Sequence, residues 1–362
     1  MLTSPRLRRV LSSLAQSTVA VFAALTLGAV LIATAGTNPF DAYAALLDGA
    51  FGDLSALLRT LRTATPLIFS GLAVAACFRA GFFFLGQEGC VYVGGLSAVL
   101  AAVYLAPSLP GFLRVATPLL VGVAAGALWA LIPALLRARL NVDEIVSSLM
   151  LNFIAILVVD FLVFEFFQDP MLGSNADRAV SAGVPPGTRL PFIAERAGLT
   201  WGFILALVAI VVAAVVFKRT IWGYESGITG LNRRFARSGG VKIAWIAISA
   251  IVVSGALAGL VGATETMGNF GRYIGGFSEN YGFQGITIAL MGRLNPLGIF
   301  AAALFFGGLR NGGASMEIAT GLPRDLVVVV QGLILLLVTA QALLPLLVSV
   351  GSRRARRITV NG

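Results

Sequence analysis

The chain has 362 residues, of which 58% are hydrophobic and only 12% are charged. Soluble domains are about 45–50% apolar and about 25% charged, so this composition excludes an ordinary soluble protein and predicts an all-α, polytopic transmembrane bundle. The net charge of +10 lies at the ends of apolar stretches, which argues against a nucleic-acid partner, and the absence of His excludes imidazole metal sites and His acid-base chemistry. No metal site is expected.

Apolar stretches follow one another with short connections, and about ten of them are interpreted as membrane spans, since a spanning helix needs about 20 apolar residues. The arginine-bearing N-terminus precedes an uncleaved first span rather than a signal peptide. An amphipathic helix on the membrane surface is expected within 38–63, and residues 311–325 are expected outside. The expected spans are 17–36, 64–80, 88–106, 114–135, 145–167, 201–217, 243–262, 285–291, 297–309 and 326–349.

Orientation follows from the basic residues. Most of the 26 Lys and Arg fall on one side of this arrangement, and the positive-inside rule then places both termini in the cytoplasm. Residues 118–146 weakly resemble 296–327, and the two copies start on opposite sides, as an inverted repeat requires. We therefore expect one transmembrane domain over 1–362, with a first half at 17–217, a cytoplasmic segment at 218–242 and a second half at 243–350.

A polar break from Gly81 to Gly89 interrupts the apolar pattern between the second and third spans. A carboxylate and an amide in hydrocarbon are costly, so Gln87 and Glu88 mark a functional site by default. Glu88 can equally lie near the cytoplasmic end and favour a helix N-terminus through the helix dipole. Other polar residues within spans either line a path or make interhelical hydrogen bonds. The candidate path residues are Phe84, Gln87, Glu88, Asn152, Glu265 and Asn295.

The segment 218–242 carries six basic residues and one acid, Glu225. Asn232 is predicted to cap a short helix through Phe235 and Ala236, which would give a soluble partner a surface to bind. The alternative is an ordinary solvated basic loop. The chain has no phosphate-binding loop of the P-loop pattern, so ATP is not bound here in that manner, and the energy source is another subunit or an ion gradient.

Several blocks occur in a characteristic order: 65–72, 78–89, 141–154, 223–239, 255–262, 276–298 and 326–334. In this order they resemble the inner-membrane permease subunits of bacterial ABC importers for nucleosides and simple sugars, within the larger group of ribose and branched-chain amino-acid permeases. Two departures stand beside Glu88. Phe84 occupies a position that is usually Asn in the family, and Cys90 one that is usually Gln, which leaves the transporter class intact and bears on the substrate.

The resemblance implies a multi-pass protein of the bacterial inner membrane that imports a nucleoside or a related small polar solute such as a simple sugar. It implies no enzyme activity, no catalytic residue and no cofactor on this chain, with ATP and Mg held by a partner. The implied partners are a cytoplasmic ABC ATPase, a second permease subunit (a copy or a paralogue), an extracytoplasmic solute-binding protein and membrane lipid. The implied ATPase-coupling residues are Gly230, Leu231, Asn232, Arg233, Arg234 and Ala236.

Two alternatives remain at this point. One is a branched-chain amino-acid ABC permease. The other is an ion-coupled secondary transporter that acts alone, with Glu88, Asp160 or Glu265 as its coupling carboxylate.

Overall fold

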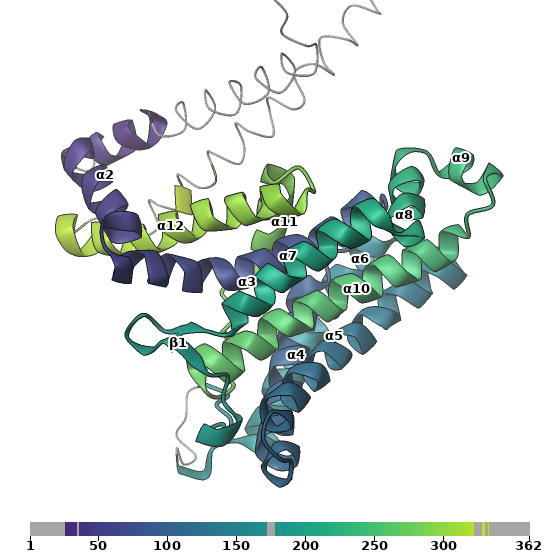
Figure 1. The fold of residues 1–362 in the computed structure, drawn as a ribbon, viewed down its shortest axis with the longest axis horizontal. Helices are drawn as coiled ribbons and strands as arrows, with labels where there is room; N and C mark the ends of the chain where they lie inside the picture. Colours follow the sequence, from purple (N-terminus) through teal and green to yellow (C-terminus); the bar gives the residue numbers. More distant parts are fainter. Residues whose placement is uncertain (1–25, 35, 172–177, 322–327, 330–331, 333–362) are drawn as a thin grey trace, which may run out of the picture. The chain divides into compact units, whose positions relative to one another are not determined.

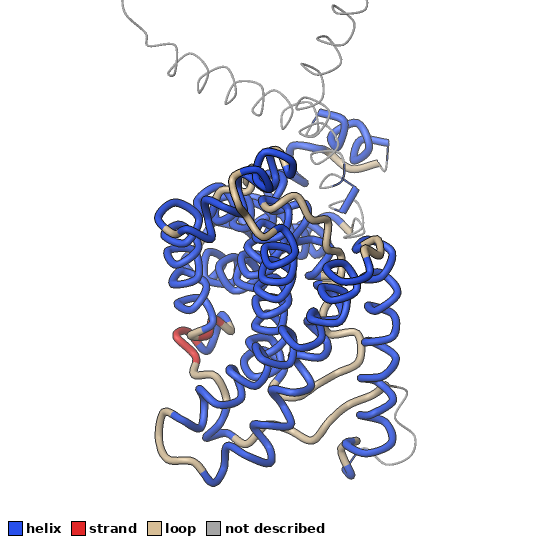
Figure 2. The backbone as a smooth tube through the Cα atoms, turned by 90° about the vertical axis from the view of Figure 1, so that its right-hand side faces the viewer, coloured by secondary structure: helices blue, strands red, loops and turns tan. Residues whose placement is uncertain are grey.

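The computed structural model describes residues 26–34, 36–171, 178–321, 328–329 and 332. Helices make up nearly all of this part of the chain (Figure 1; Figure 2). The helices are α2 (Pro39–Leu47), α3 (Leu54–Arg79), α4 (Gln87–Leu100), α5 (Leu113–Leu140), α6 (Glu144–Leu162), α7 (Gly202–Arg219), α8 (Ile221–Leu231), α9 (Arg233–Ser238), α10 (Ile243–Thr264), α11 (Tyr281–Met291) and α12 (Pro296–Thr320). Segments of π-helix cover Asp48–Gly52, Ala101–Leu105, Val163–Phe167 and Glu265–Phe270. Short 3₁₀ turns cover Ala106–Ser108, Pro186–Thr188 and Glu195–Ala197.

One small hairpin departs from the all-helical expectation. Strand β1 (Phe192–Ala194) pairs antiparallel with β2 (Leu199–Thr200), with Phe192 opposite Thr200. Gly198 takes a φ of 67° in the turn, a conformation that costs glycine little. The prediction of a polytopic helical bundle is otherwise confirmed.

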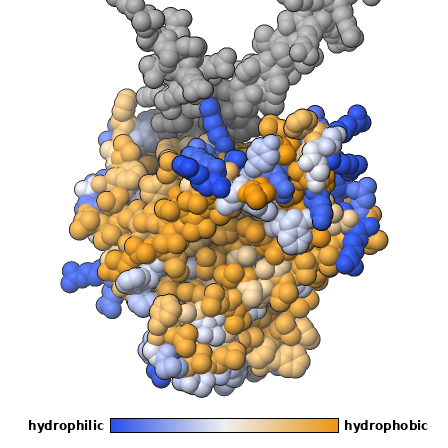
Figure 3. Space-filling view, turned by 45° about the vertical axis from the view of Figure 1, so that its right-hand side comes forward, coloured by the Kyte–Doolittle hydropathy of each residue, from blue (hydrophilic) through white to orange (hydrophobic). Residues whose placement is uncertain are grey.

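Six described helical stretches are long and apolar enough to cross a membrane: Leu54–Arg79, Gln87–Ser108, Leu113–Leu140, Glu144–Phe167, Gly202–Arg219 and Ile243–Phe270. Only 22% of the most apolar window of Glu144–Phe167 is buried within the protein, compared with 78% for Leu54–Arg79. Hydrophobic side chains cover most of the face seen in Figure 3. Apolar surface on this scale needs lipid or another subunit against it.

Contacts divide the chain into two units, one of residues 57–307 and one of residues 1–56 with 308–362. In the larger unit, α10 packs most extensively against α5 and α4. Glycines make these crossings possible, because a Cβ on Gly94 would lie 2.5 Å from Gly259 Cα, and one on Gly126 would lie 2.4 Å from Gly255 O. Without a hydrophobic drive between helices in lipid, such close backbone approach supplies the packing energy.

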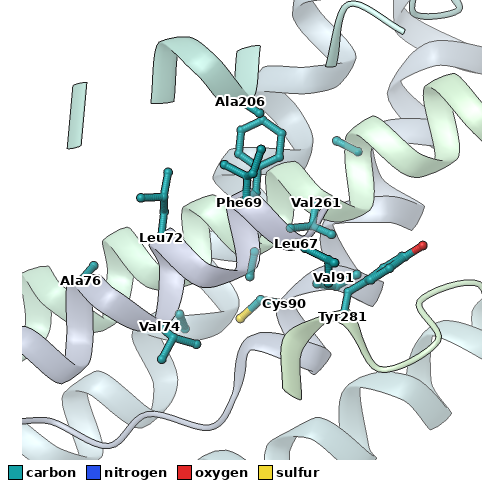
Figure 4. Packing of buried hydrophobic residues seen from close by; sticks show 14 of the residues in the cluster. Leu67, Phe69, Leu72, Val74, Ala76, Cys90, Val91, Ala206, Val261 and Tyr281 are labelled. Carbon is teal, nitrogen blue, oxygen red and sulfur yellow. The ribbon is translucent and has the colours of Figure 1, made fainter. Parts of the chain in front are cut away.

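The core of the larger unit joins helices that are distant in sequence (Figure 4). Leu67 and Phe69 of α3 are buried in one cluster with Val91 of α4, Val261 of α10 and Tyr281 of α11. The break between α3 and α4 is therefore held by a continuous packed interior on both sides.

Three expected boundaries are wrong. The second expected span starts at Leu54 rather than 64, because the Asp53 carboxylate accepts a hydrogen bond from Ala56 N and starts a helix whose apolar pattern continues without interruption. The segment 38–63 folds into α2, the π-helical turn Asp48–Gly52 and the start of α3, and its place on the membrane surface stays a prediction. The span expected over 243–262 corresponds to a longer helix, because α10 continues as the π-helical turn Glu265–Phe270.

The C-terminal half of α12 gives the third correction. The helix expected to end at 309 continues to Thr320 as α12, and the location of residues 311–325 outside stays a prediction. In the smaller unit Asn311 Nδ2 donates to Gly49 O at 2.8 Å and to Ala56 O at 3.2 Å. This polar side chain is therefore hydrogen-bonded within a contact between helical segments. A Cβ on Gly312 would lie 2.1 Å from Leu46 O, which fixes the same contact.

The count of ten spans, the orientation and the inverted repeat stay predictions. Half of the expected span 17–36 and most of the expected span 326–349 lie outside the described residues. Helix α11 has 11 residues, too few to cross a membrane that needs about 20.

Candidate functional site

The polar break is a short stretch of irregular backbone between α3 and α4. Gly81 has a φ of 76°, and a Cβ there would lie 3.0 Å from Gly230 Cα, so both the conformation and the space require glycine. Phe82 and Phe84 are each 1% exposed, whereas Phe83 is 51% exposed. The break thus presents one aromatic ring outward and buries the two on either side of it.

Side chains of α6 satisfy the backbone of the break. Leu85 N donates to Ser148 Oγ at 3.1 Å. Asn152 Nδ2 donates to Leu85 O at 2.7 Å, and its Oδ1 accepts from Gly89 N at 2.8 Å. Irregular backbone at membrane depth is tolerated only where buried groups re-satisfy it, and Asn152 meets one carbonyl and one N–H at once.

Gln87, the first residue of α4, links the same stretch to α10. Its Nε2 donates to Phe84 O at 2.8 Å and to Ser254 Oγ at 3.3 Å, and the residue is 1% exposed. Three of the predicted path residues, Phe84, Gln87 and Asn152, are therefore joined in one hydrogen-bonded cluster around the break. Ser148 and Ser254, which complete this cluster, carry no sequence signal that separates them from other span serines.

Glu88 lies where two helices begin. It occupies the first turn of α4, is 3% exposed, and its Oε2 accepts from Gly282 N, in the first turn of α11, at 2.8 Å. Asn280, which precedes α11, has a φ of 65° and provides no side-chain cap. The carboxylate of Glu88 takes over that role, since helix N-termini carry unsatisfied N–H groups and favour negative charge.

The other two predicted path residues have different partners. Glu265 is 4% exposed and its Oε2 accepts from Asn269 Nδ2 at 2.9 Å, while Asn269 Oδ1 accepts from Arg62 Nε at 3.0 Å. Asn295 is exposed, and its Oδ1 accepts from Leu297 N at 3.2 Å, as an N-cap of α12 does. Asn295 is thus at a helix end rather than in the cluster around the break.

The basic segment forms two short helices beside the break. Asn232 caps α9 as predicted, because its Oδ1 accepts from Arg234 N at 3.0 Å and Phe235 N at 3.1 Å. Leu231 is 88% exposed and Phe235 is 64% exposed, so apolar side chains stand outward among the arginines. Ala236 is fully buried. The segment is a structured surface rather than an ordinary solvated loop.

A polar pair that sequence reasoning did not connect joins α6 to the irregular segment after α10. Tyr273 Oη donates to Asp160 Oδ1 at 2.6 Å. Burial, and then the hydrogen bond to Asp160, raises the pKa of Tyr273 above its ordinary range, so the phenol stays protonated as the donor. A cavity of about 490 Å³ adjoins this pair and is lined by Asp160, Phe164, Arg178, Ala179, Gly275 and Gly276. In the part of the chain that the structure describes, no group of three or more Cys, Asp or Glu side chains is placed to hold a metal ion.

Comparison with known proteins adds relatives over nearly the whole length. A family model described as branched-chain amino acid transport system / permease component matches residues 56–339. The guanosine ABC transporter permease protein of Bacillus subtilis is 32% identical over 91% of this chain and 94% of its own. The glucose ABC transporter permease protein of Haloferax volcanii is 35% identical over 89% of this chain and 86% of its own. The nucleoside ABC transporter permease protein of Lactococcus lactis is 30% identical over 89% of this chain and 90% of its own.

Proposed function

This chain belongs to the permease component family of the branched-chain amino acid transport system, and from that premise we propose that it is the membrane-spanning permease subunit of an ABC importer for nucleosides. The observation that carries the substrate class is the match of about nine-tenths of the chain to a guanosine and a nucleoside permease. The glucose permease among the relatives makes a simple sugar the second candidate. The chain is a transport subunit and a multi-pass protein of the inner membrane.

The proposed partners are a cytoplasmic ABC ATPase, a second permease subunit and an extracytoplasmic solute-binding protein. ATP and Mg would be held by the ATPase, and this chain would bind neither. The broad exposed apolar faces of α6 and α7 support contact with lipid and a second membrane subunit.

The proposed ATPase-coupling segment comprises Gly230, Leu231, Asn232, Arg233, Arg234 and Ala236, of which Ala236 is buried and supports the segment from within. Exposed Leu231 and Phe235 beside the exposed Arg234 and Arg237 give this segment the apolar anchors and the charge that protein interfaces use. Replacing Leu231 to Phe235 with a Gly-Ser linker is expected to abolish co-purification of the ATPase. Retention of the ATPase at the parental stoichiometry would reject this docking surface.

The proposed orientation puts both termini in the cytoplasm, within one transmembrane domain of ten spans that carries an inverted repeat. In support, α3, α5 and α7 end on basic residues and α10 follows Lys242, and α8 and α9 lie at the opposite end of the larger unit from β1 (Figure 1). A membrane-impermeant maleimide added to intact cells is expected to label Ile193→Cys and to spare Leu231→Cys. The reverse pattern would overturn the orientation.

The proposed translocation path runs beside the polar break, with Phe84, Gln87, Glu88, Asn152, Glu265 and Asn295 as its candidate residues. Intramembrane polar groups gathered around interrupted helices support this proposal. Phe83, the exposed ring of the break, is an additional candidate for contact with a base or a sugar.

Uptake of radiolabelled guanosine by cells that express the complete importer tests the function. Uptake is expected to survive a proton uncoupler and to disappear when the partner ATPase is deleted. Uptake that survives ATPase deletion and collapses with the uncoupler would instead support an ion-coupled transporter, with Glu88, Asp160 or Glu265 as the coupling carboxylate.

A further inference from the structure

The proposed docking helix and the polar break are in direct contact through Arg233. Its Nη2 donates to Gly81 O at 2.5 Å, and its guanidinium carbon lies 4.7 Å from the centroid of the Phe82 ring. A guanidinium both hydrogen-bonds through its planar fork and stacks on an aromatic face, so this one side chain engages the backbone and the side chain of adjacent break residues. Arg233 therefore faces its own subunit at this point.

The break side of this contact is held firmly. Phe82 is 1% exposed and belongs to the core of the larger unit. A Cβ on Gly230 would lie 2.2 Å from Arg79 O, so the last turn of α8 touches the backbone at the end of α3. If α8 or Arg233 shifts, either the Arg233 contacts with Gly81 and Phe82 are lost or the polar break moves with them.

The α9 side is also fixed. Arg233 is the first residue of α9, whose N-terminus is capped by Asn232 and whose one buried residue is Ala236. The helix has six residues, so it moves as a single short body with Arg233 at its end. Further along the break, Phe84 O accepts from Gln87 and Leu85 O accepts from Asn152.

We propose that Arg233 is a positioning residue that transmits movement of the docking helix α9 to the polar break, rather than a contact to the ATPase itself. The inference rests on the proposed function, because it requires an ATPase that moves α9. It assigns two roles to neighbouring residues: Leu231 and Phe235 would bind the ATPase, and Arg233 would pass the displacement to Gly81 and Phe82. Coupling between two sites needs an element whose arrangement both sites bias, and the proposal assigns this role to the break.

A spin label at Phe83→Cys reads the break without requiring a known substrate. Phe83 is half-exposed, whereas the two native cysteines, Cys77 and Cys90, are fully buried and are not expected to react. In the full complex with its ATPase, addition of ATP and vanadate is expected to change the label's spectrum. Arg233→Ala is expected to remove most of this change, because it eliminates both the hydrogen bond to Gly81 and the contact with the Phe82 ring.

Matched variants separate a relay from a docking or a folding effect. Arg237→Ala, on the same exposed helix, is expected to keep the parental spectral change, and Arg233→Lys is expected to restore only part of it because it keeps the charge without the planar fork. Arg233→Ala is expected to retain the ATPase at the parental stoichiometry and the parental elution volume. Phe82→Leu, which keeps an apolar side chain and removes the ring, is expected to combine non-additively with Arg233→Lys.

The outcomes distinguish the two proposals. Loss of the ATPase from Arg233→Ala would make Arg233 a docking residue and would overturn the relay while leaving the docking surface intact. An undiminished spectral change in Arg233→Ala, or no change in the parent, would also overturn the relay. The Gly-Ser linker removes Arg233 together with Leu231 and Phe235, so loss of the ATPase from the linker variant supports the docking residues only when Arg233→Ala retains the ATPase.

Discussion

Asn152→Leu removes the side chain that joins α6 to Leu85 and Gly89 of the polar break. The substitution leaves Leu85 O and Gly89 N without their partners at 2.7 Å and 2.8 Å, while it keeps a side chain of similar size. Because Asn152 is 2% exposed, water does not readily replace it. The variant therefore measures how much the two hydrogen bonds of Asn152 contribute to the free energy of unfolding.

The magnitude follows from the two groups left unpaired. Interhelical hydrogen bonds within membranes average about 0.6 kcal/mol, which sets a lower value near 1 kcal/mol for two bonds. Each buried backbone group left unsatisfied costs about 1–3 kcal/mol. Since both the donor and the acceptor are deep in the larger unit, we expect Asn152→Leu to lower the free energy of unfolding by about 2–4 kcal/mol.

Reversible denaturant unfolding in mixed micelles measures this difference. Met150→Leu on the same helix, at a position 55% exposed, is the control and is expected to stay within about 0.5 kcal/mol of the parent. Ser148→Ala, which leaves only Leu85 N unpaired, is expected to cost about 1 kcal/mol. An Asn152→Leu value indistinguishable from that of Met150→Leu would refute the view that Asn152 holds the break.

Three further substitutions test separate parts of the molecule. Gly262→Ala is expected to unfold or severely destabilise the protein in thermal melts, because its Cβ would lie 2.0 Å from a backbone carbonyl of α4. The control Gly227→Ala should melt at or above the parental temperature, because its Cβ meets only a guanidinium at 3.6 Å. Glu88→Gln keeps an acceptor for α11 and is expected to fold normally, while Glu88→Leu should lose about 1–3 kcal/mol in the same unfolding assay; equal stability of the two would disprove the capping role. Tyr273→Phe removes the hydrogen bond to Asp160, and a double-mutant cycle with Asp160→Asn should give a coupling of about 1 kcal/mol, with strict additivity as the contrary result.

The sequence located the break because polarity at membrane depth is rare. Gln87 and Glu88 stand out in an apolar run, and the capping role of Asn232 followed from its position before a short helical pattern. The transporter class could be predicted for a different reason, because several motif blocks of the permease family occur in order along the chain. These features are local or ordered in sequence, so neither requires knowledge of tertiary contacts.

Features that depend on long-range partners were not predictable. Glu88 caps α11 through Gly282, a residue 194 positions away, and no local pattern distinguishes that contact from a cap on α4. The expected span 297–309 ends before Asn311, although the amide of Asn311 donates to two carbonyls inside a helix contact. Arg233 was grouped with the ATPase-coupling residues, and only the fold reveals its hydrogen bond to Gly81.

Import by the purified complex tests the central claim most directly. Proteoliposomes that contain this permease, its second membrane subunit, the ATPase and the solute-binding protein should accumulate radiolabelled guanosine only when ATP and Mg are supplied on the ATPase side. Omitting the solute-binding protein should abolish accumulation. Accumulation driven by a proton gradient without ATP, or ATP-dependent accumulation of leucine with none of guanosine or glucose, would contradict the account.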